Sequence, residues 1–138
     1  MATFFTIKDK VSATRPLSMA TVLHRYHPAN KWGVRIEVYE CNNTNSAPHA
    51  HYFNRNGYVG RFRLSVEEDN PLKEYTSILP KSIDDIVEMK GDSIDTKDKE
   101  IIFNCMTSKD CNGKYDTHWE KALDRWTDEN PHVWINWK

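Results

Sequence analysis

The spacing of hydrophobic residues changes near the middle of the chain, from the period of strands to that of helices. In residues 33–40, the apolar side chains of Val34, Ile36 and Val38 alternate with polar ones. This alternation predicts a half-buried strand. Residues 17–26 fit a strand or a short helix equally well. Three further segments favour short strands, namely residues 3–7, residues 72–79 and the tail from His132 to Lys138.

Residues 48–66 predict a β-hairpin. Asn56-Gly57 is a strong signal for a two-residue turn, and such a turn sets Arg55 opposite Tyr58. Because side chains alternate across a strand, each face of the hairpin is then defined. One face is expected to carry His49, His51, Phe53, Phe62, Leu64 and Val66, and the other Ala50, Tyr52, Val59, Arg61 and Arg63. This register turns both histidines toward the apolar side and away from the arginines.

Helical patterns follow in the second half. Ser82 can cap a short helix that Gly91 ends, and Asp95 or Thr96 can open a second one. The apolar side of the second helix is expected to hold Ile101, Ile102, Cys105 and Met106. Thr117-His118-Trp119-Glu120 has capping-box spacing, and Asn130-Pro131 stops the helix that it opens. The apolar stripe of this last helix comprises Trp119, Ala122, Leu123 and Trp126.

Strands that precede helices predict a single α+β domain over residues 1–138. We expect an antiparallel sheet, with the Asn-Gly hairpin at its centre and the helices of the C-terminal half packed on one face. Trp119, Leu123 and Trp126 are expected to cover the apolar face of the hairpin.

Charge and length limit the functional classes. The 138 residues carry a formal net charge of −1, which argues against a general nucleic-acid-binding protein. This net charge is still compatible with a local basic face. The sequence has no apolar run long enough to cross a bilayer and does not begin like a signal peptide. The three cysteines are an odd number without paired spacing. Together these features predict a cytoplasmic protein.

The two strand histidines, His49 and His51, are candidates for a general acid and base. A ribonuclease-like reaction also needs a cation near the phosphate, and the expected register places Arg61 and Arg63 on the other face. We therefore favour a structural role for this pair. His49 and His51 could also bind a metal with Cys41, but the chain lacks the spacing of zinc sites. No Ser/His/Asp arrangement and no glycine-rich phosphate loop stands out.

Two surfaces are candidates for binding. The face with Tyr52, Arg61 and Arg63 interleaves basic and aromatic side chains, as single-stranded RNA-binding sheets do. In the tail, Trp134 and Trp137 point to opposite faces of a strand, so one sheet cannot bury both. An exposed tryptophan is typical of a protein-binding surface.

Three pieces of the sequence together resemble a known group of proteins. They are Ile36-Glu37-Val38-Tyr39, Pro48-His49-Ala50-His51-Tyr52, and Thr117-His118-Trp119-Glu120 followed by Trp126 and Asn130-Pro131. They resemble small bacterial proteins of uncharacterised function with a Pro-His-aromatic-His strand and a closing Thr-Asn-Trp-Glu helix, often encoded on mobile elements or near toxin–antitoxin modules. The chain departs from this pattern at Ala50 and His118. The resemblance implies a bacterial or phage origin and carries no established activity.

We therefore expect a small, non-catalytic binding protein that needs no cofactor. Its partner is expected to be another protein, in a mobile-element, antitoxin or defence-related setting. The alternatives are a small ribonuclease that uses His49 and His51, and a metal-binding or single-stranded RNA-binding domain.

Overall fold

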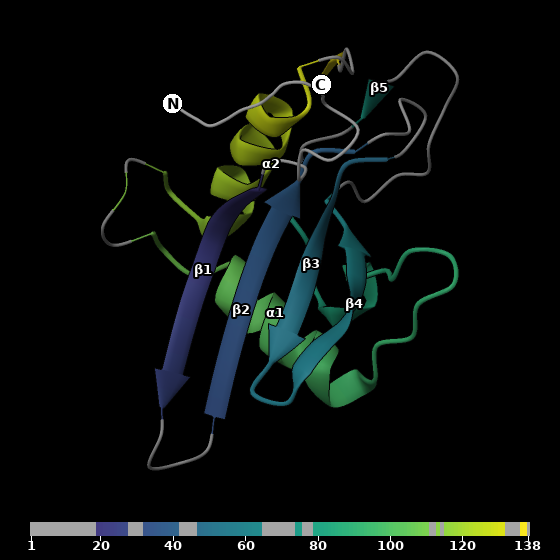
Figure 1. The fold of residues 1–138 in the computed structure, drawn as a ribbon, viewed down its shortest axis with the longest axis vertical. Helices are drawn as coiled ribbons and strands as arrows, with labels where there is room; N and C mark the ends of the chain where they lie inside the picture. Colours follow the sequence, from purple (N-terminus) through teal and green to yellow (C-terminus); the bar gives the residue numbers. More distant parts are fainter. Residues whose placement is uncertain are drawn as a thin grey trace, which may run out of the picture.

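A four-stranded antiparallel sheet carries two helices on one of its faces (Figure 1). The structure, a computed structural model, describes residues 19–27, 32–41, 47–64, 74–75, 79–110, 113, 115–131 and 136–137. The strands of the main sheet are β1 (Met19–His27), β2 (Trp32–Tyr39), β3 (His49–Asn54) and β4 (Gly57–Arg63), in that order. The other elements are β5 (Glu74–Tyr75), the 3-10 helix η3 (Ile83–Asp85), α1 (Thr96–Met106), α2 (His118–Glu129) and β6 (Asn136–Trp137). The predicted α+β class is confirmed.

Residues 17–26, which the sequence left between strand and helix, lie mostly in the edge strand β1. At the opposite edge of the sheet, residues 87–89 run along β4. Arg63 N donates to Val87 O at 2.9 Å, and Met89 N donates to Arg61 O at 2.9 Å. The short strand predicted within residues 72–79 is β5. It pairs in parallel with β6 in a separate small sheet. Residues 3–7, Val66 and Trp134 lie outside the described residues.

The predicted register of the hairpin is wrong by one residue. Asn54 pairs with Gly57, so Arg55 and Asn56 form the turn, and Gly57 adopts a φ of 115° that favours glycine. If only the turn had moved, His51 would pair with Gly60 and would point to the same face as Phe62. An irregularity between Tyr52 and Phe53 adds one residue on β4, and His51 therefore pairs with Arg61. A one-residue shift exchanges the faces.

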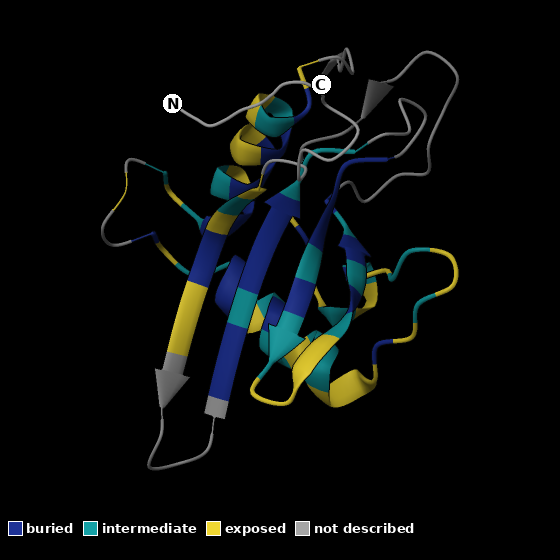
Figure 2. Ribbon diagram, viewed as in Figure 1, coloured by how far each residue is buried: buried dark blue, intermediate teal, exposed yellow. Residues whose placement is uncertain are grey.

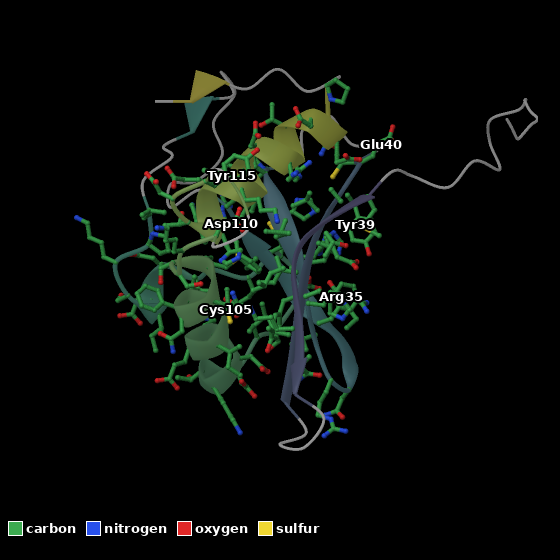
Figure 3. All side chains as sticks on the ribbon, turned by 90° about the vertical axis from the view of Figure 1, so that its left-hand side faces the viewer. Arg35, Tyr39, Glu40, Cys105, Asp110 and Tyr115 are labelled. Atoms are coloured by element: carbon green, nitrogen blue, oxygen red, sulfur yellow. The ribbon has the colours of Figure 1, made fainter. Side chains whose placement is uncertain are left out.

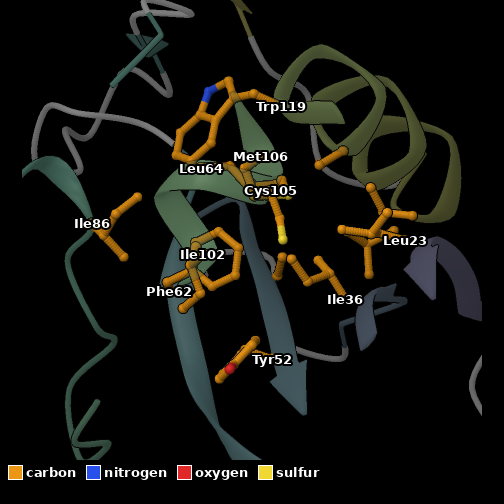
Figure 4. Close-up of a cluster of buried hydrophobic side chains, with 14 of the residues drawn as sticks. Leu23, Ile36, Tyr52, Phe62, Leu64, Ile86, Ile102, Cys105, Met106 and Trp119 are labelled. Carbon is orange, nitrogen blue, oxygen red and sulfur yellow. The ribbon is translucent and has the colours of Figure 1, made fainter. Parts of the chain in front are cut away.

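As a consequence, the two histidine positions share their face with Arg61 and Arg63. The residues that alternate with them point into the core. Ala50, Tyr52, Phe62 and Leu64 are all fully buried. They join Ile36 and its buried neighbours on β2 beneath the helices (Figures 2 and 4). Trp119 packs on Phe62 with ring centroids 6.2 Å apart. We correctly expected α2 to pack on the apolar face of the hairpin, but that face consists of other residues than the ones predicted.

Two of the three predicted helices begin where their caps indicate. The Asp95 side chain accepts from the backbone N–H of Asp98 at the start of α1. Thr117 and Glu120 form a complete capping box at the start of α2. The helix expected after Ser82 is only the 3-10 turn η3. Among the described residues, no helix combines the length and the apolar character needed to cross a membrane.

At its C-terminal end, α2 is bonded to the sheet through Asn130, which is fully buried. Its Oδ1 accepts from Cys41 N at 2.6 Å, and its Nδ2 donates to Tyr39 O at 3.0 Å. These bonds hold the helical layer against the end of β2.

Candidate functional site

The face of the main sheet that points away from α1 and α2 is the candidate site, and we call it the helix-free face. On β2 and β3, and on β4 from Gly60 onward, its residues alternate with buried core residues. Figure 3 shows Arg35 and Tyr39 on this side, whereas Cys105 and Asp110 lie on the helical side. From β2, β3 and β4 the face carries Arg35, Glu37, Tyr39, His51, Phe53, Tyr58, Arg61 and Arg63. His49, at the start of β3, also lies near α2, with its ring centroid 6.5 Å from that of Trp126.

At β2, charged and aromatic side chains already contact one another. The guanidinium carbon of Arg35 lies 4.0 Å from the centroid of the Phe53 ring, a cation–π contact. Arg35 Nε is also 2.9 Å from Glu37 Oε2, but its N–H is not directed at the carboxylate, so we describe the contact as an ion pair. Tyr39 donates its hydroxyl hydrogen to Glu37. Burial and this bond raise the pKa of Tyr39 to about 12.

His51 lies at the centre of the face. Its ring centroid is 4.5 Å from that of Tyr39, 5.3 Å from that of His49 and 6.1 Å from that of Tyr58. Burial, and then the nearby His49 and Arg61, lower the pKa of His51 from 6.5 to about 4, although Asp92 opposes the shift. The imidazole is therefore neutral at pH 7, and can accept a proton but rarely has one to donate.

At β4, Asp92 organises the side chains. Its Oδ2 accepts from Arg61 Nε at 2.7 Å, from Arg61 N at 2.8 Å and from Tyr58 Oη at 3.0 Å. These bonds, chiefly those from Arg61, outweigh burial and hold the pKa of Asp92 below its usual value. Tyr58 nevertheless remains 51% exposed. The face thus presents aromatic rings and arginines whose charges are largely balanced by neighbouring acids.

The expected binding surface of Tyr52, Arg61 and Arg63 does not exist as a unit. Tyr52 is fully buried on the core side, where its hydroxyl donates to Asp98 Oδ1 at 2.9 Å. Burial and this bond raise its pKa well above the ordinary value. Arg61 and Arg63 lie on the opposite face, with the histidines. Of the tail tryptophans, Trp134 and the side chain of Trp137 are outside the described residues.

The histidine pair is also placed differently from the expectation. His49 is only 4% exposed, and its Nδ1 lies 2.7 Å from Ala47 O. Cys41, His49 and His51 do not assemble a metal site, because no three His, Cys, Asp or Glu side chains of the described residues gather closely enough to hold an ion.

A second polar cluster, which sequence reasoning missed, lies between α1 and α2. It consists of Ser108, Asp110 and His118. Burial lowers the pKa of His118, although Asp110 opposes this. All three residues occur within a short stretch around Gly113, and that proximity in sequence was the available signal.

Comparisons with known proteins add no functional assignment. No protein-family model matches this chain, and neither the curated proteins nor the solved structures yield a match.

Proposed function

We propose that this protein acts by binding another protein through the helix-free face and that it has no catalytic activity. The observation that carries the proposal is the composition of that face, where Arg35, Phe53, Tyr58 and Arg63 lie on the same side of the sheet as His51. Arginine and aromatic residues are enriched in protein interfaces and dominate their binding energy, whereas lysine is depleted. Strands β1 to β4 contain no lysine.

Charge balance favours a protein over a nucleic acid as the partner. Arg35 is paired with Glu37, and Arg61 with Asp92. A surface that binds phosphates needs an excess of cations, because counterion release supplies much of the affinity. The proposal includes a cytoplasmic location, which the odd number of cysteines favours.

The test compares one variant of the face with a matched variant elsewhere. Tyr58→Ala removes a tyrosine that donates to Asp92 on the helix-free face, and Tyr115→Ala removes one that donates to Asp124 of α2 on the helical side. Each protein is immobilised and used to capture partners from the source cells. A captured protein is then purified, and its affinity is measured by calorimetry.

We expect Tyr58→Ala to weaken the purified complex about 10-fold or more, as interface tyrosines do, and Tyr115→Ala to leave it unchanged. Equal affinity of all three proteins for every captured partner would contradict the proposal. Capture of RNA alone, lost on Tyr58→Ala, would instead identify a nucleic-acid-binding face.

A second candidate function is a ribonuclease, because the structure brings together groups that the expected register separated. His51 pairs with Arg61, and His49 pairs with Arg63. Such a reaction needs a base, an acid and a cation around one phosphate. With a pKa of about 4, His51 is neutral at pH 7 but only a weak base, and His49 is almost fully buried, which leaves the acid without an accessible group. Cleavage of a labelled RNA by the wild type that is lost in His51→Asn would favour this candidate.

A further inference from the structure

The turn between β3 and β4 presents an asparagine followed by a glycine to solvent. Arg55 and Asn56 form the turn, and residues 55–58 are all exposed. The turn lies at one end of the helix-free face, where the rings of Phe53 and Tyr58 contact each other with centroids 5.5 Å apart. Exposed tips of loops are the parts of a fold in which the backbone moves most easily. A reaction between neighbouring groups of the chain therefore meets little resistance here.

The fold does not use the side-chain amide of Asn56. The backbone N–H of Asn56 donates to Asn54 Oδ1 at 2.8 Å, so the amide that shapes this turn belongs to Asn54. None of the described residues forms a hydrogen bond with the Asn56 side chain. The carbonyl carbon of that side chain, Cγ, therefore remains accessible as an electrophile.

Gly57 supplies a nucleophile that no side chain screens. Its backbone nitrogen follows Asn56 directly, and its attack on Cγ closes a succinimide ring. Apart from the chain neighbours of Gly57, no atom of the described residues lies within 4 Å of a Cβ built at this position. The pair of Asn54 and Gly57 is the last of the ladder, and pairs at the end of a ladder open most easily. Ring closure therefore leaves the core undisturbed.

We propose that Asn56 is a site of spontaneous deamidation through a succinimide. The Gly57 nitrogen forms a bond to Asn56 Cγ and gives up its hydrogen, and the side-chain nitrogen leaves with that hydrogen as ammonia. Water then opens the ring. Hydrolysis of the new bond at Cγ gives aspartate, whereas hydrolysis of the original peptide bond gives isoaspartate, in which the main chain runs through the former side chain. Water is the only co-reactant, and no group is oxidised or reduced.

Both products change the end of the helix-free face. Each adds a negative charge next to Tyr58, which is 51% exposed. Isoaspartate also lengthens the backbone of the turn, whose present length fits the pair of Asn54 and Gly57. The isoaspartyl carboxylate is in addition a substrate for enzymes that methylate this group. The inference is independent of the proposed protein partner, because the reaction needs only this turn and water.

The test follows the full chain in mildly alkaline buffer, with and without urea. The proteins are the wild type, Asn56→Gln and Asn112→Gln, which changes the second Asn-Gly pair of the sequence and serves as the matched variant. Samples are digested with pepsin at acidic pH, where ring closure is slow, and the peptides are analysed by mass spectrometry. Isoaspartate is detected by enzymatic methylation. Asn54, which precedes Arg55 in the same hairpin, is the internal control.

We expect Asn56 of the folded wild type to convert at least about 10-fold faster than Asn54, because the residue after Asn54 carries a side chain and the residue after Asn56 does not. Isoaspartate should appear at position 56, and Asn112→Gln should leave this conversion unchanged. Asn56→Gln should abolish methylation of the hairpin peptide, because the longer side chain closes a ring much more slowly.

Three results would overturn the proposal. In the first, Asn56 keeps its amide in the folded protein while the chain in urea converts, which would show that the hairpin protects it. In the second, aspartate forms without isoaspartate, which would indicate direct hydrolysis rather than a ring. In the third, Asn56→Gln retains methylation of the hairpin peptide, which would place the isoaspartate at another residue.

Discussion

Acidification should destabilise this protein partly through His51, and the structure allows the effect to be estimated. The folded protein lowers the pKa of His51 from 6.5 to about 4. Above pH 6.5 the ring is neutral in both states. Between pH 6.5 and 4 the unfolded chain binds a proton that the folded protein does not, so stability falls as the pH falls through this window. Below pH 4 the contribution is fully lost.

For these two pKa values, the loss between pH 7 and pH 4.5 is at most about 2.4 kcal/mol. Because the ring is only partly buried, solvent screening reduces this figure, and we expect ~1 kcal/mol. The charged and titratable groups of the described residues near His51 come from three places. Glu37 and Tyr39 lie on β2, His49 lies on β3, and Tyr58 and Arg61 lie on β4, with Asp92 beyond it. These groups are present in both the wild type and the His51 variant, so they titrate in both proteins.

The assay is urea denaturation of the wild type and of His51→Asn at pH 7, 5.5 and 4.5. The substitution itself changes the free energy of unfolding at every pH. The informative quantity is therefore how the difference in unfolding free energy between the two proteins changes with pH. The wild type should lose ~1 kcal/mol more than the variant between pH 7 and 4.5. His24→Asn, at an exposed position of β1, provides the histidine control. Parallel pH profiles for the wild type and His51→Asn would refute the reasoning.

Three substitutions test the framework that holds the helix-free face. Asn130→Ala removes the bonds to Cys41 N and Tyr39 O and should cost about 3 kcal/mol in urea denaturation, because buried groups lose their partners; a cost under ~1 kcal/mol would show that water replaces the amide. Gly57→Ala should cost about 1 kcal/mol, since φ is 115° and no atom lies within 4 Å of the new Cβ, and an unchanged Tm would contradict this. Thr117→Ala should cost about 1 kcal/mol and Thr117→Ser much less, because serine keeps the capping oxygen.

Much of the fold could be predicted where the information is local. Thr117 and Glu120 are three residues apart and form the capping box by themselves, so the start of α2 was predicted correctly. The alternation in residues 33–40 likewise identified β2 and its buried side. The candidate sites were less predictable. Ser108, Asp110 and His118 lie within one short stretch, but no sequence pattern indicates that their side chains meet.

By itself, the sequence determined the order of strands and helices, their caps and the presence of a hairpin near Asn56-Gly57. Only the tertiary structure decided which side of that hairpin faces water. Ile36 pairs with Tyr52, and both must lie beneath the helices together with Phe62. One extra residue on β4 satisfies this requirement and turns Arg61 toward His51. The physical reason is that a strand has a period of two, so burial of the core, rather than the turn, selected the register.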